Sequence, residues 1–264
     1  MPNHQPARGN PLEPTQKSRL AHRFDGALSA SRTAVKGSPL VAVLPLSVAF
    51  AAIAWSIHDG GKAPGDVALL SDLHRHSTRV VESLARWTTH LGDVGTVALL
   101  ALTIAAVLAW RQRRRDGLAL LTSVVGAGVA AAVFKQIFER QRPHLFSWLI
   151  SEGGYSFPSG HSTGSMALAL AVAVTFWKNR HGTLIGVAAI GAAVIVAASR
   201  LELGVHYPSD VLAGWLVAAA SVTVVTWVNR DTRFASRFAP VCEDGPRVAA
   251  ATTAKESRNA RPGR

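Results

Sequence analysis

A histidine and an aspartate stand four residues apart in the segment SRLELGVHYPSD, residues 199–210 of this 264-residue chain. His206 falls in a short turn, and Pro208 begins an apolar stretch whose first helical turn contains Asp210. The spacing lets the carboxylate reach one imidazole nitrogen and leaves the other nitrogen able to react. A structural cap at a helix start has the same residues, so this segment alone is consistent with either an activated histidine or a cap.

Two cations precede this pair in the segment 135–143. Lys135 and Arg142 are seven residues apart, which is about two helical turns, so a helix would place both on one face. Pro143 removes a backbone donor and disfavours helix at the residue before it, so the helix is expected to end there. Two cations on one face at a membrane surface suggest an anion site, although from this segment alone snorkelling toward lipid headgroups is the favoured explanation.

The third polar segment is Pro158-Ser159-Gly160-His161, which opens another apolar stretch. Ser159 suits an N-cap, and Gly160 allows close approach of another group to the backbone. The unpaired N–H groups of a first helical turn form a ready anion site, with His161 at its mouth. The alternative is an ordinary helix start with an interfacial histidine.

Six apolar stretches must position these segments. Each is close to the ~20 residues that cross a bilayer as helix, and the chain shows no strand-length alternation. Because lipid admits only helices or closed barrels, the sequence predicts an all-α bundle of six transmembrane helices. The stretches are 38–57, 93–110, 117–138, 160–177, 183–201 and 209–228.

The net charge of +12 is concentrated in two tails and in short links between the apolar stretches. This distribution favours a membrane protein over a nucleic-acid-binding one. Residues 1–36 and 229–264 are predicted to be disordered basic cytoplasmic tails around a six-span domain at 37–228. Placing both termini inside puts most of the 28 Lys and Arg residues on the cytoplasmic side, and it puts all three polar segments outside.

The outer loop 58–92 contains apolar residues at mostly helical spacing over 66–87. Its length and charge predict a helix that lies on the outer membrane surface. His74, Arg75 and His76 on this helix are interpreted as a solvated face rather than a metal or substrate site. Headgroup and tail specificity is expected to come from this loop and from residues 144–157.

Taken together, the three segments resemble the signature of the type 2 phosphatidic acid phosphatase family. That signature has a Lys, six residues and Arg-Pro; then Pro-Ser-Gly-His; then Ser-Arg, five residues, a His, three residues and an Asp. Every fixed position is present at the right spacing. The six-span layout resembles the bacterial membrane branch of the family, so the resemblance covers about residues 38–228.

The resemblance implies a set of roles and no metal or other cofactor. His206 would be the nucleophile, Asp210 would orient its ring, and His161 would protonate the leaving oxygen and then activate water. The residues that would hold the phosphoryl oxygens are Lys135, Arg142, Arg200, Ser159 and Gly160. Ser199 belongs to the pattern and is interpreted as structural.

The leading functional prediction is hydrolysis of a lipid phosphate or lipid pyrophosphate at the outer face of a bacterial plasma membrane. Phosphatidic acid, phosphatidylglycerol phosphate and polyprenyl diphosphates all fit, and the partners are lipid substrate and bilayer, not nucleic acid. A phosphatase of a soluble ester, as in the related glucose-6-phosphatase group, shares these motifs. The vanadium haloperoxidase type is disfavoured by six spans in a short chain. A non-catalytic lipid-binding or transport protein would not need His206, Asp210 and His161 together.

Overall fold

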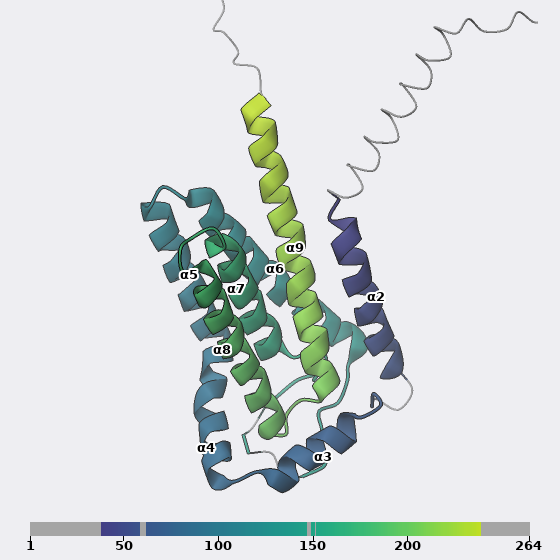
Figure 1. Cartoon of the computed structure of the whole chain (residues 1–264). Helices are drawn as coiled ribbons and strands as arrows, with labels where there is room; N and C mark the ends of the chain where they lie inside the picture. The colour runs from purple at the N-terminus through teal and green to yellow at the C-terminus, as the bar shows by residue number, and fades with distance from the viewer. Residues whose placement is uncertain (1–37, 59–61, 147–148, 151, 239–264) are drawn as a thin grey trace, which may run out of the picture. The chain divides into compact units, whose positions relative to one another are not determined.

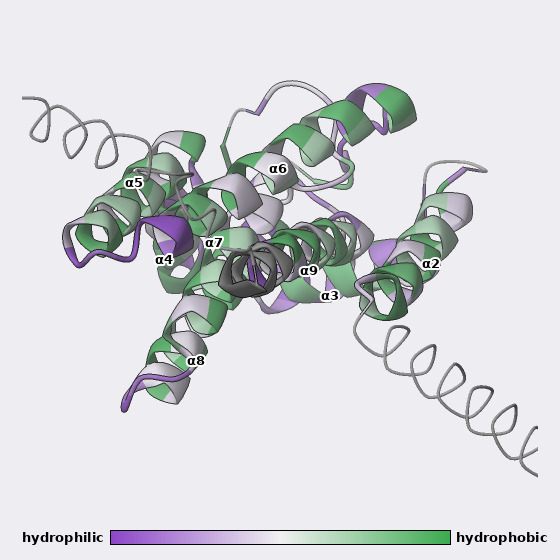
Figure 2. Ribbon diagram, turned by 90° about the horizontal axis from the view of Figure 1, so that it is seen from above, coloured by the Kyte–Doolittle hydropathy of each residue, from purple (hydrophilic) through white to green (hydrophobic). Residues whose placement is uncertain are grey.

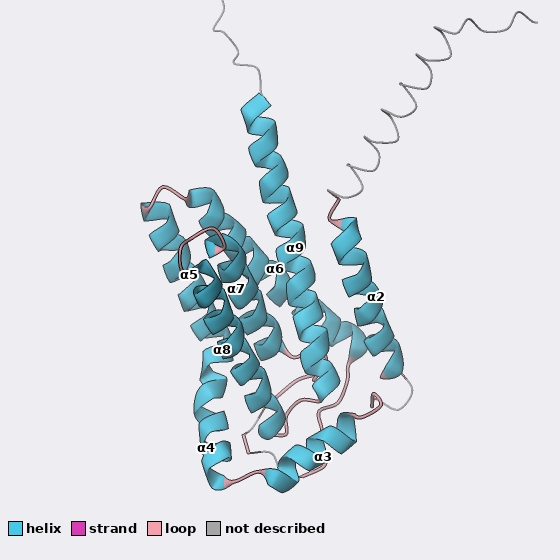
Figure 3. Cartoon of the chain, in the orientation of Figure 1, coloured by secondary structure: helices cyan, strands magenta, loops and turns pink. Residues whose placement is uncertain are grey.

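The computed structural model describes residues 38–58, 62–146, 149–150 and 152–238, so the predicted tail 1–36 lies outside the described residues. The chain forms two units, Met1–Asn229 and Arg230–Arg264, and the site belongs to the first. Throughout the described ranges the regular elements are helices, with no strand, which confirms the all-α prediction (Figure 3).

Each predicted apolar stretch forms a helix close to its expected bounds (Figure 1). Length and hydropathy qualify three helices to cross a membrane, namely Arg114–Phe138, Gly182–Glu202 and Pro208–Arg230. A fourth span results if Arg79–Gly92 and Val94–Trp110, which meet at 51°, act as one broken helix. The six helices are α2 (Leu40–Ser56), α5 (Val94–Trp110), α6 (Arg114–Phe138), α7 (Gly160–Phe176), α8 (Gly182–Glu202) and α9 (Pro208–Phe238).

The C-terminal helix α9 continues to Phe238, ten residues past the predicted end of the last span. The sequence contains no Gly or Pro between 229 and 238 that would stop a helix. Position 228 therefore marks the end of the apolar run, not the end of the helix. The rest of the predicted C-terminal tail, 239–264, lies outside the described residues.

The first outer loop forms two helices where the sequence predicted one over 66–87. These are α3 (Asp66–His76) and α4 (Arg79–Thr88), and the 3-10 turn η1 (Thr89–Gly92) follows. Thr78 is extended and its side chain accepts a hydrogen bond from the Val81 N–H, so it caps α4. Ser and Thr at Ser77-Thr78 favour such caps over helix interiors, which explains the break.

The predicted solvated face is exposed at the end of α3. His74, Arg75 and His76 all lie at the surface, and the His74 ring stacks on Phe146 at 3.8 Å. In the part of the chain that the structure describes, no group of three or more His, Cys, Asp or Glu residues could hold a metal ion.

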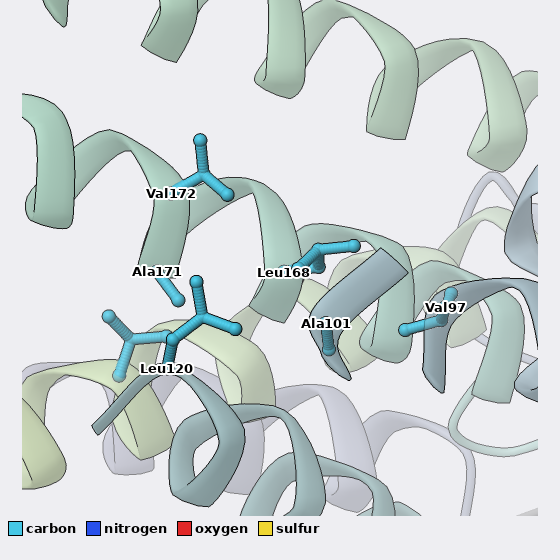
Figure 4. Packing of buried hydrophobic residues seen from close by; sticks show 7 residues of the cluster. Val97, Ala101, Leu120, Leu168, Ala171 and Val172 are labelled. Carbon is cyan, nitrogen blue, oxygen red and sulfur yellow. The ribbon is translucent and has the colours of Figure 1, made fainter. Parts of the chain in front are cut away.

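Helix α7 packs against both α6 and α8, and its buried positions are mainly small residues. Ala127, Ala167, Ala193 and Ala218 belong to one buried cluster, and Figure 4 shows a second around Leu120. Small residues let helix backbones approach closely, as membrane helices require. Many large apolar residues are exposed instead, among them Leu99, Val125 and Leu184. Figure 2 shows hydrophobic residues along most of the helices. This arrangement suits a lipid surround.

Close contact between α7 and α9 joins two of the polar segments. A Cβ added to Gly214 would lie 2.7 Å from Thr163 Oγ1 and 3.0 Å from the Ser159 carbonyl oxygen, so only glycine fits there. The Ser159 N–H accordingly donates a hydrogen bond to the backbone oxygen of Asp210 at 3.0 Å. The start of α7 and the start of α9 are therefore fixed side by side.

Candidate active site

His206 lies in the turn between α8 and α9 and is almost fully buried, at 2% exposure. Its Nδ1 is 3.4 Å from Asp210 Oδ2, and the same oxygen accepts the Tyr207 N–H at 2.8 Å. Burial lowers the pKa of His206 to about 3, although Asp210 acts in the opposite direction. The ring is therefore neutral near pH 7, and its Nε2 is not used by Asp210.

Arg142 faces that second nitrogen. Its Nη1 is 3.2 Å from His206 Nε2 and donates to the Val205 carbonyl at 3.0 Å. Its other nitrogens donate to the carbonyl oxygens of Gly153 at 2.9 Å and Gly154 at 3.1 Å. This buried guanidinium is therefore held beside His206 Nε2 by three backbone carbonyl oxygens.

The prediction that Lys135 and Arg142 share one helical face is wrong. Helix α6 ends before Glu139, which adopts a left-handed conformation with φ of 44°, so the chain leaves the helix three residues before Arg142. Lys135 hydrogen-bonds the Tyr155 carbonyl and lies beside Gly160, whose added Cβ would be 3.9 Å from Lys135 Cε. The two cations still lie near enough to interact, one from α6 and the other from the segment that follows it.

Arg200, in the last turn of α8, is completely buried. Its Nη1 donates to Thr89 Oγ1 at 2.7 Å, and its Nη2 lies 2.5 Å from Glu152 Oε1. Among the residues that the structure describes, the buried Nε of Arg200 has no hydrogen-bond partner. A donor left unpaired in a buried site is costly unless a ligand satisfies it.

Glu152 bridges two of the predicted phosphate-binding cations. Besides its contact with Arg200, its Oε2 is 3.5 Å from Arg142 Nη2. Burial alone would raise the pKa of Glu152, but the hydrogen bond and charge of Arg200, with Arg142, hold it below its ordinary value. The space between these guanidiniums therefore stabilises an anion. The sequence placed this residue only within a segment expected to set specificity.

His161, in the first turn of α7, has its own carboxylate partner. Its Nε2 is 2.9 Å from Asp93 Oδ1, and the other Asp93 oxygen contacts His90 Nδ1 at 2.9 Å. A Cβ on Gly92 would lie 3.0 Å from His161 Cδ2, so glycine makes room for the ring. Sequence reasoning missed Asp93, because an acidic residue before an apolar stretch normally indicates only a helix cap.

The start of α7 matches the predicted cap. Ser159 Oγ accepts the Ser162 N–H at 3.5 Å and the Ser162 hydroxyl at 3.1 Å, and Gly160 is the first helical residue. Ser199 donates to the Val196 carbonyl at 2.6 Å within its own helix, which supports a structural role.

One further buried residue contacts Asp210, and a second buried residue contacts the first. Arg140 Nη1 is 2.5 Å from Asp210 Oδ1, and Arg140 Nη2 is 2.6 Å from Asp66 Oδ2. Neither residue was predicted, since no local pattern distinguishes Arg140 from the other cations near the end of α6. Asp66 lies in the outer loop, far from all three segments in sequence.

A cavity of about 720 Å³ adjoins the cluster. Arg142 and Tyr207 line it from the site, and Ala54 of α2 and Ile57 at the end of that helix line it from the other side. His206 and His161 are not among the residues described as lining it, so the cavity meets the site at Arg142 and Tyr207.

The three polar segments meet, as predicted. Arg142 joins the first segment to His206 of the third, Ser159 joins the second to Asp210 of the third, and Lys135 lies beside Gly160. The structure thus brings cations, two histidines and a buried aspartate into one site, which is the set of groups that phosphoryl transfer uses.

Comparison with known proteins agrees with this geometry. The model of the PAP2 superfamily matches residues 116–234, which include all three segments. Phosphatidylglycerophosphatase B of Bacillus subtilis is 33% identical over 48% of this chain and 64% of the relative. An undecaprenyl-diphosphatase of Sulfolobus acidocaldarius is 35% identical over 44% of this chain and 56% of the relative. Each of these two matches therefore spans less than two thirds of the relative's length.

A third relative is matched over more of its length. Decaprenylphosphoryl-5-phosphoribose phosphatase of Mycolicibacterium smegmatis is 37% identical over 49% of this chain and 69% of the relative. Among solved structures, a transmembrane PAP2 type phosphatidylglycerolphosphate phosphatase from Bacillus subtilis superposes with a TM-score of 0.64 at 26% identity. That superposition covers 75% of this chain and 98% of the other. With the motif segments assembled and these relatives matched, the chain belongs to the PAP2 superfamily.

Proposed function

We propose that the protein is an integral membrane phosphatase that releases phosphate from phosphomonoester or pyrophosphate groups of lipids, with a phosphohistidine intermediate on His206. The observation that carries the proposal is the position of His206 Nε2. This nitrogen is not bonded to Asp210, belongs to a neutral buried ring, and lies 3.2 Å from Arg142 Nη1. A nucleophile beside a fixed cation is the arrangement that attack on a phosphoryl group needs.

In the first step, Nε2 of His206 forms a bond to phosphorus while the bond from phosphorus to the leaving oxygen breaks, and His161 gives that oxygen a proton. In the second step, water attacks phosphorus and gives its proton to His161, and the bond between Nε2 and phosphorus breaks. Asp210 accepts the Nδ1–H of His206 in both steps and stabilises the positive ring of the intermediate.

The phosphoryl oxygens would be bound by Lys135, Arg142 and Arg200, together with Ser159 and the Gly160 N–H. The unpaired buried Nε of Arg200 supports this assignment, because a phosphoryl oxygen would satisfy it. The position of Glu152 between two guanidiniums also supports it, since a phosphate dianion is stabilised by the same charges. These cations supply positive charge from the chain itself, and we propose that catalysis is metal-independent.

The proposed substrate class rests on the apolar helices of the chain and on the substrates for which its relatives are named. The relatives are named for phosphatidylglycerophosphate, undecaprenyl diphosphate and a decaprenylphosphoryl phosphoribose, all of which carry phosphate on lipid. The cavity beside Arg142 has apolar wall residues from α2, which suits part of such a molecule. Six apolar helices are the basis for proposing six spans. The charge distribution supports both tails being cytoplasmic and the site lying at the extracytoplasmic face of the plasma membrane.

Phosphate release by the purified full chain tests the proposal. The panel contains phosphatidic acid, phosphatidylglycerol phosphate, a polyprenyl diphosphate and glucose 6-phosphate, each with and without EDTA. His206→Ala should reduce release from lipid substrates by about 10³-fold or more. His76→Ala, which changes an exposed histidine outside the site, should behave as wild type.

Four outcomes would contradict parts of this account. Release that survives in His206→Ala would remove the phosphohistidine mechanism, and loss of release in EDTA would remove the metal-independent one. Preference for glucose 6-phosphate would favour a phosphatase of soluble esters. Lipid binding without any release would favour a non-catalytic binding or transport protein.

A further inference from the structure

Asp210 uses its two carboxylate oxygens on different partners. Oδ2 accepts the Tyr207 N–H at 2.8 Å and lies 3.4 Å from His206 Nδ1, whereas Oδ1 lies 2.5 Å from Arg140 Nη1. A carboxylate held at both oxygens cannot rotate about its Cβ–Cγ bond. The direction in which Asp210 faces His206 therefore depends on Arg140.

Arg140 is fixed in turn by its own surroundings. Its Nη2 is 2.6 Å from Asp66 Oδ2, and the side chains of both residues are only 3% exposed. Its Nη1 also donates to Ser209 Oγ at 2.7 Å, and its guanidinium carbon lies 4.2 Å from the centre of the Tyr207 ring. The guanidinium has contacts on several sides and little freedom to move away from Asp210.

Asp66 connects this group to the outer loop. It is the first residue of α3, and its carboxylate accepts the Ser209 N–H at 3.0 Å, the Ser209 hydroxyl at 2.6 Å and the Ala63 N–H at 3.1 Å. Figure 1 shows α3 near the end of α9 at which Pro208 begins. The first turn of α3 is therefore bound to the helical turn that carries Asp210.

The charges of this group complement the reaction. Asp66, Arg140 and Asp210 together carry one net negative charge in a buried place. The cations Lys135 and Arg142 also interact electrostatically with Asp210, but they are proposed to bind the phosphoryl oxygens. The excess negative charge of the group is therefore left to stabilise the His206 ring, which becomes positive on phosphorylation. If Arg140 paired with Asp210 alone, it would neutralise the negative charge of that carboxylate. Because Asp66 pairs with the same guanidinium, the group keeps a net negative charge. A preorganised charge of this kind favours the intermediate over the free enzyme.

We propose that Asp66 and Arg140 are positioning residues that hold Asp210 oriented and ionised for the phosphorylation of His206. This inference rests on the proposed function. It also gives the outer loop a role at the catalytic centre in addition to any role in specificity.

The test compares Asp66→Asn and Arg140→Lys with wild type, on whichever lipid phosphate wild type hydrolyses best. Asparagine keeps the shape of Asp66 without its charge, and lysine keeps the charge of Arg140 but cannot hold two carboxylates as a planar fork. Each variant should lower kcat by about 10- to 100-fold while KM changes by less than about threefold. The matched control is Asp116→Asn, which removes the Arg113–Asp116 pair at the start of α6 and should leave kcat within about twofold.

Two inhibitors separate positioning from general structural damage. Orthovanadate bonds to the nucleophile, so its inhibition constant should rise at least about fivefold in both variants, whereas that of inorganic phosphate should stay within about twofold. The double variant should lose little more than Arg140→Lys alone, because both changes act on one chain of contacts.

Near-normal kcat in both variants would overturn the inference. So would parallel losses in kcat and in phosphate and vanadate binding with a lowered melting temperature, since these indicate structural damage alone. In either case His206→Ala would still abolish release if the proposed function holds. Failure of wild type on every substrate would instead reject the proposed function.

Discussion

The two histidines of the site each pair with a carboxylate, but the two pairs differ in their exposure to water. The side chains of His206 and Asp210 are 2% and 0% exposed, whereas those of His161 and Asp93 are 19% and 44% exposed. A nucleophile benefits from a fixed, desolvated position, and a proton donor and acceptor needs access to solvent. The difference in burial therefore agrees with the division of roles that we propose.

The partners of the two carboxylates differ in the same way. Asp210 is shared with the buried cation Arg140, whereas Asp93 is shared with His90 at the surface. Burial of an ionised carboxylate without a cation would destabilise the folded protein, so the ion pair with Arg140 keeps Asp210 buried and charged. The exposed contact between Asp93 and His90 contributes far less to stability.

Removal of each carboxylate should show the contrast most strongly. Asp210→Asn should lower kcat by about 10³- to 10⁴-fold, because an amide no longer fixes the tautomer of His206 or stabilises its positive form. Asp93→Asn should cost about tenfold or less, because water can replace an exposed partner. Steady-state kinetics on one lipid phosphate measures both, and equal losses would show that burial does not separate the roles.

Glu152 offers a test of intermediate size. This carboxylate competes with a phosphoryl group for Arg142 and Arg200, so Glu152→Gln should tighten inhibition by inorganic phosphate by about threefold. The control Glu82→Gln alters a half-buried residue of α4 outside the site and should leave the inhibition constant unchanged. Weaker phosphate binding in Glu152→Gln would mean that Glu152 orients the guanidiniums for substrate and does not compete with it.

The smallest expected effect concerns stability and pH. The pKa of His206 is lowered to about 3, so below about pH 6.5 the unfolded chain takes up a proton that the folded chain does not. Folding stability contributed by the neutral ring is therefore present above pH 6.5 and lost as the pH falls toward 3. The variant His206→Gln has no ionisable group at this position and does not lose this stability. The difference between its melting temperature and that of wild type should therefore shift in favour of the variant as the pH is lowered from 7 to 5. A constant difference would contradict the buried neutral ring.

The sequence predicted the helices and the meeting of the three polar segments well, because both depend on local signals. Apolar runs set the helix bounds within a few residues, except at the end of α9, and Ser159 caps α7 as expected. The prediction failed where a single backbone angle decides the path, as at Glu139, and where two cap-forming residues split the outer-loop helix.

The site residues that the sequence did not predict were missed for a different reason. Asp66, Arg140 and Glu152 act through contacts between segments far apart in the chain, such as the 74 positions that separate Asp66 from Arg140. Charged residues in loops normally lie in solvent, so sequence patterns assign them no role. Only the folded chain shows that these side chains pair in or near the buried site.

The central claim is a covalent phosphohistidine on His206, and acid-free trapping of the phosphorylated protein tests it most directly. Purified protein is mixed with a lipid phosphate labelled on phosphorus, quenched in base within milliseconds, and mapped by mass spectrometry. We expect label on His206 that acid removes, no label in His206→Ala, and more persistent label in His161→Ala when the substrate has a good leaving group, because water is then activated slowly. Steady release of phosphate with no label on His206 in any of these proteins would contradict the account.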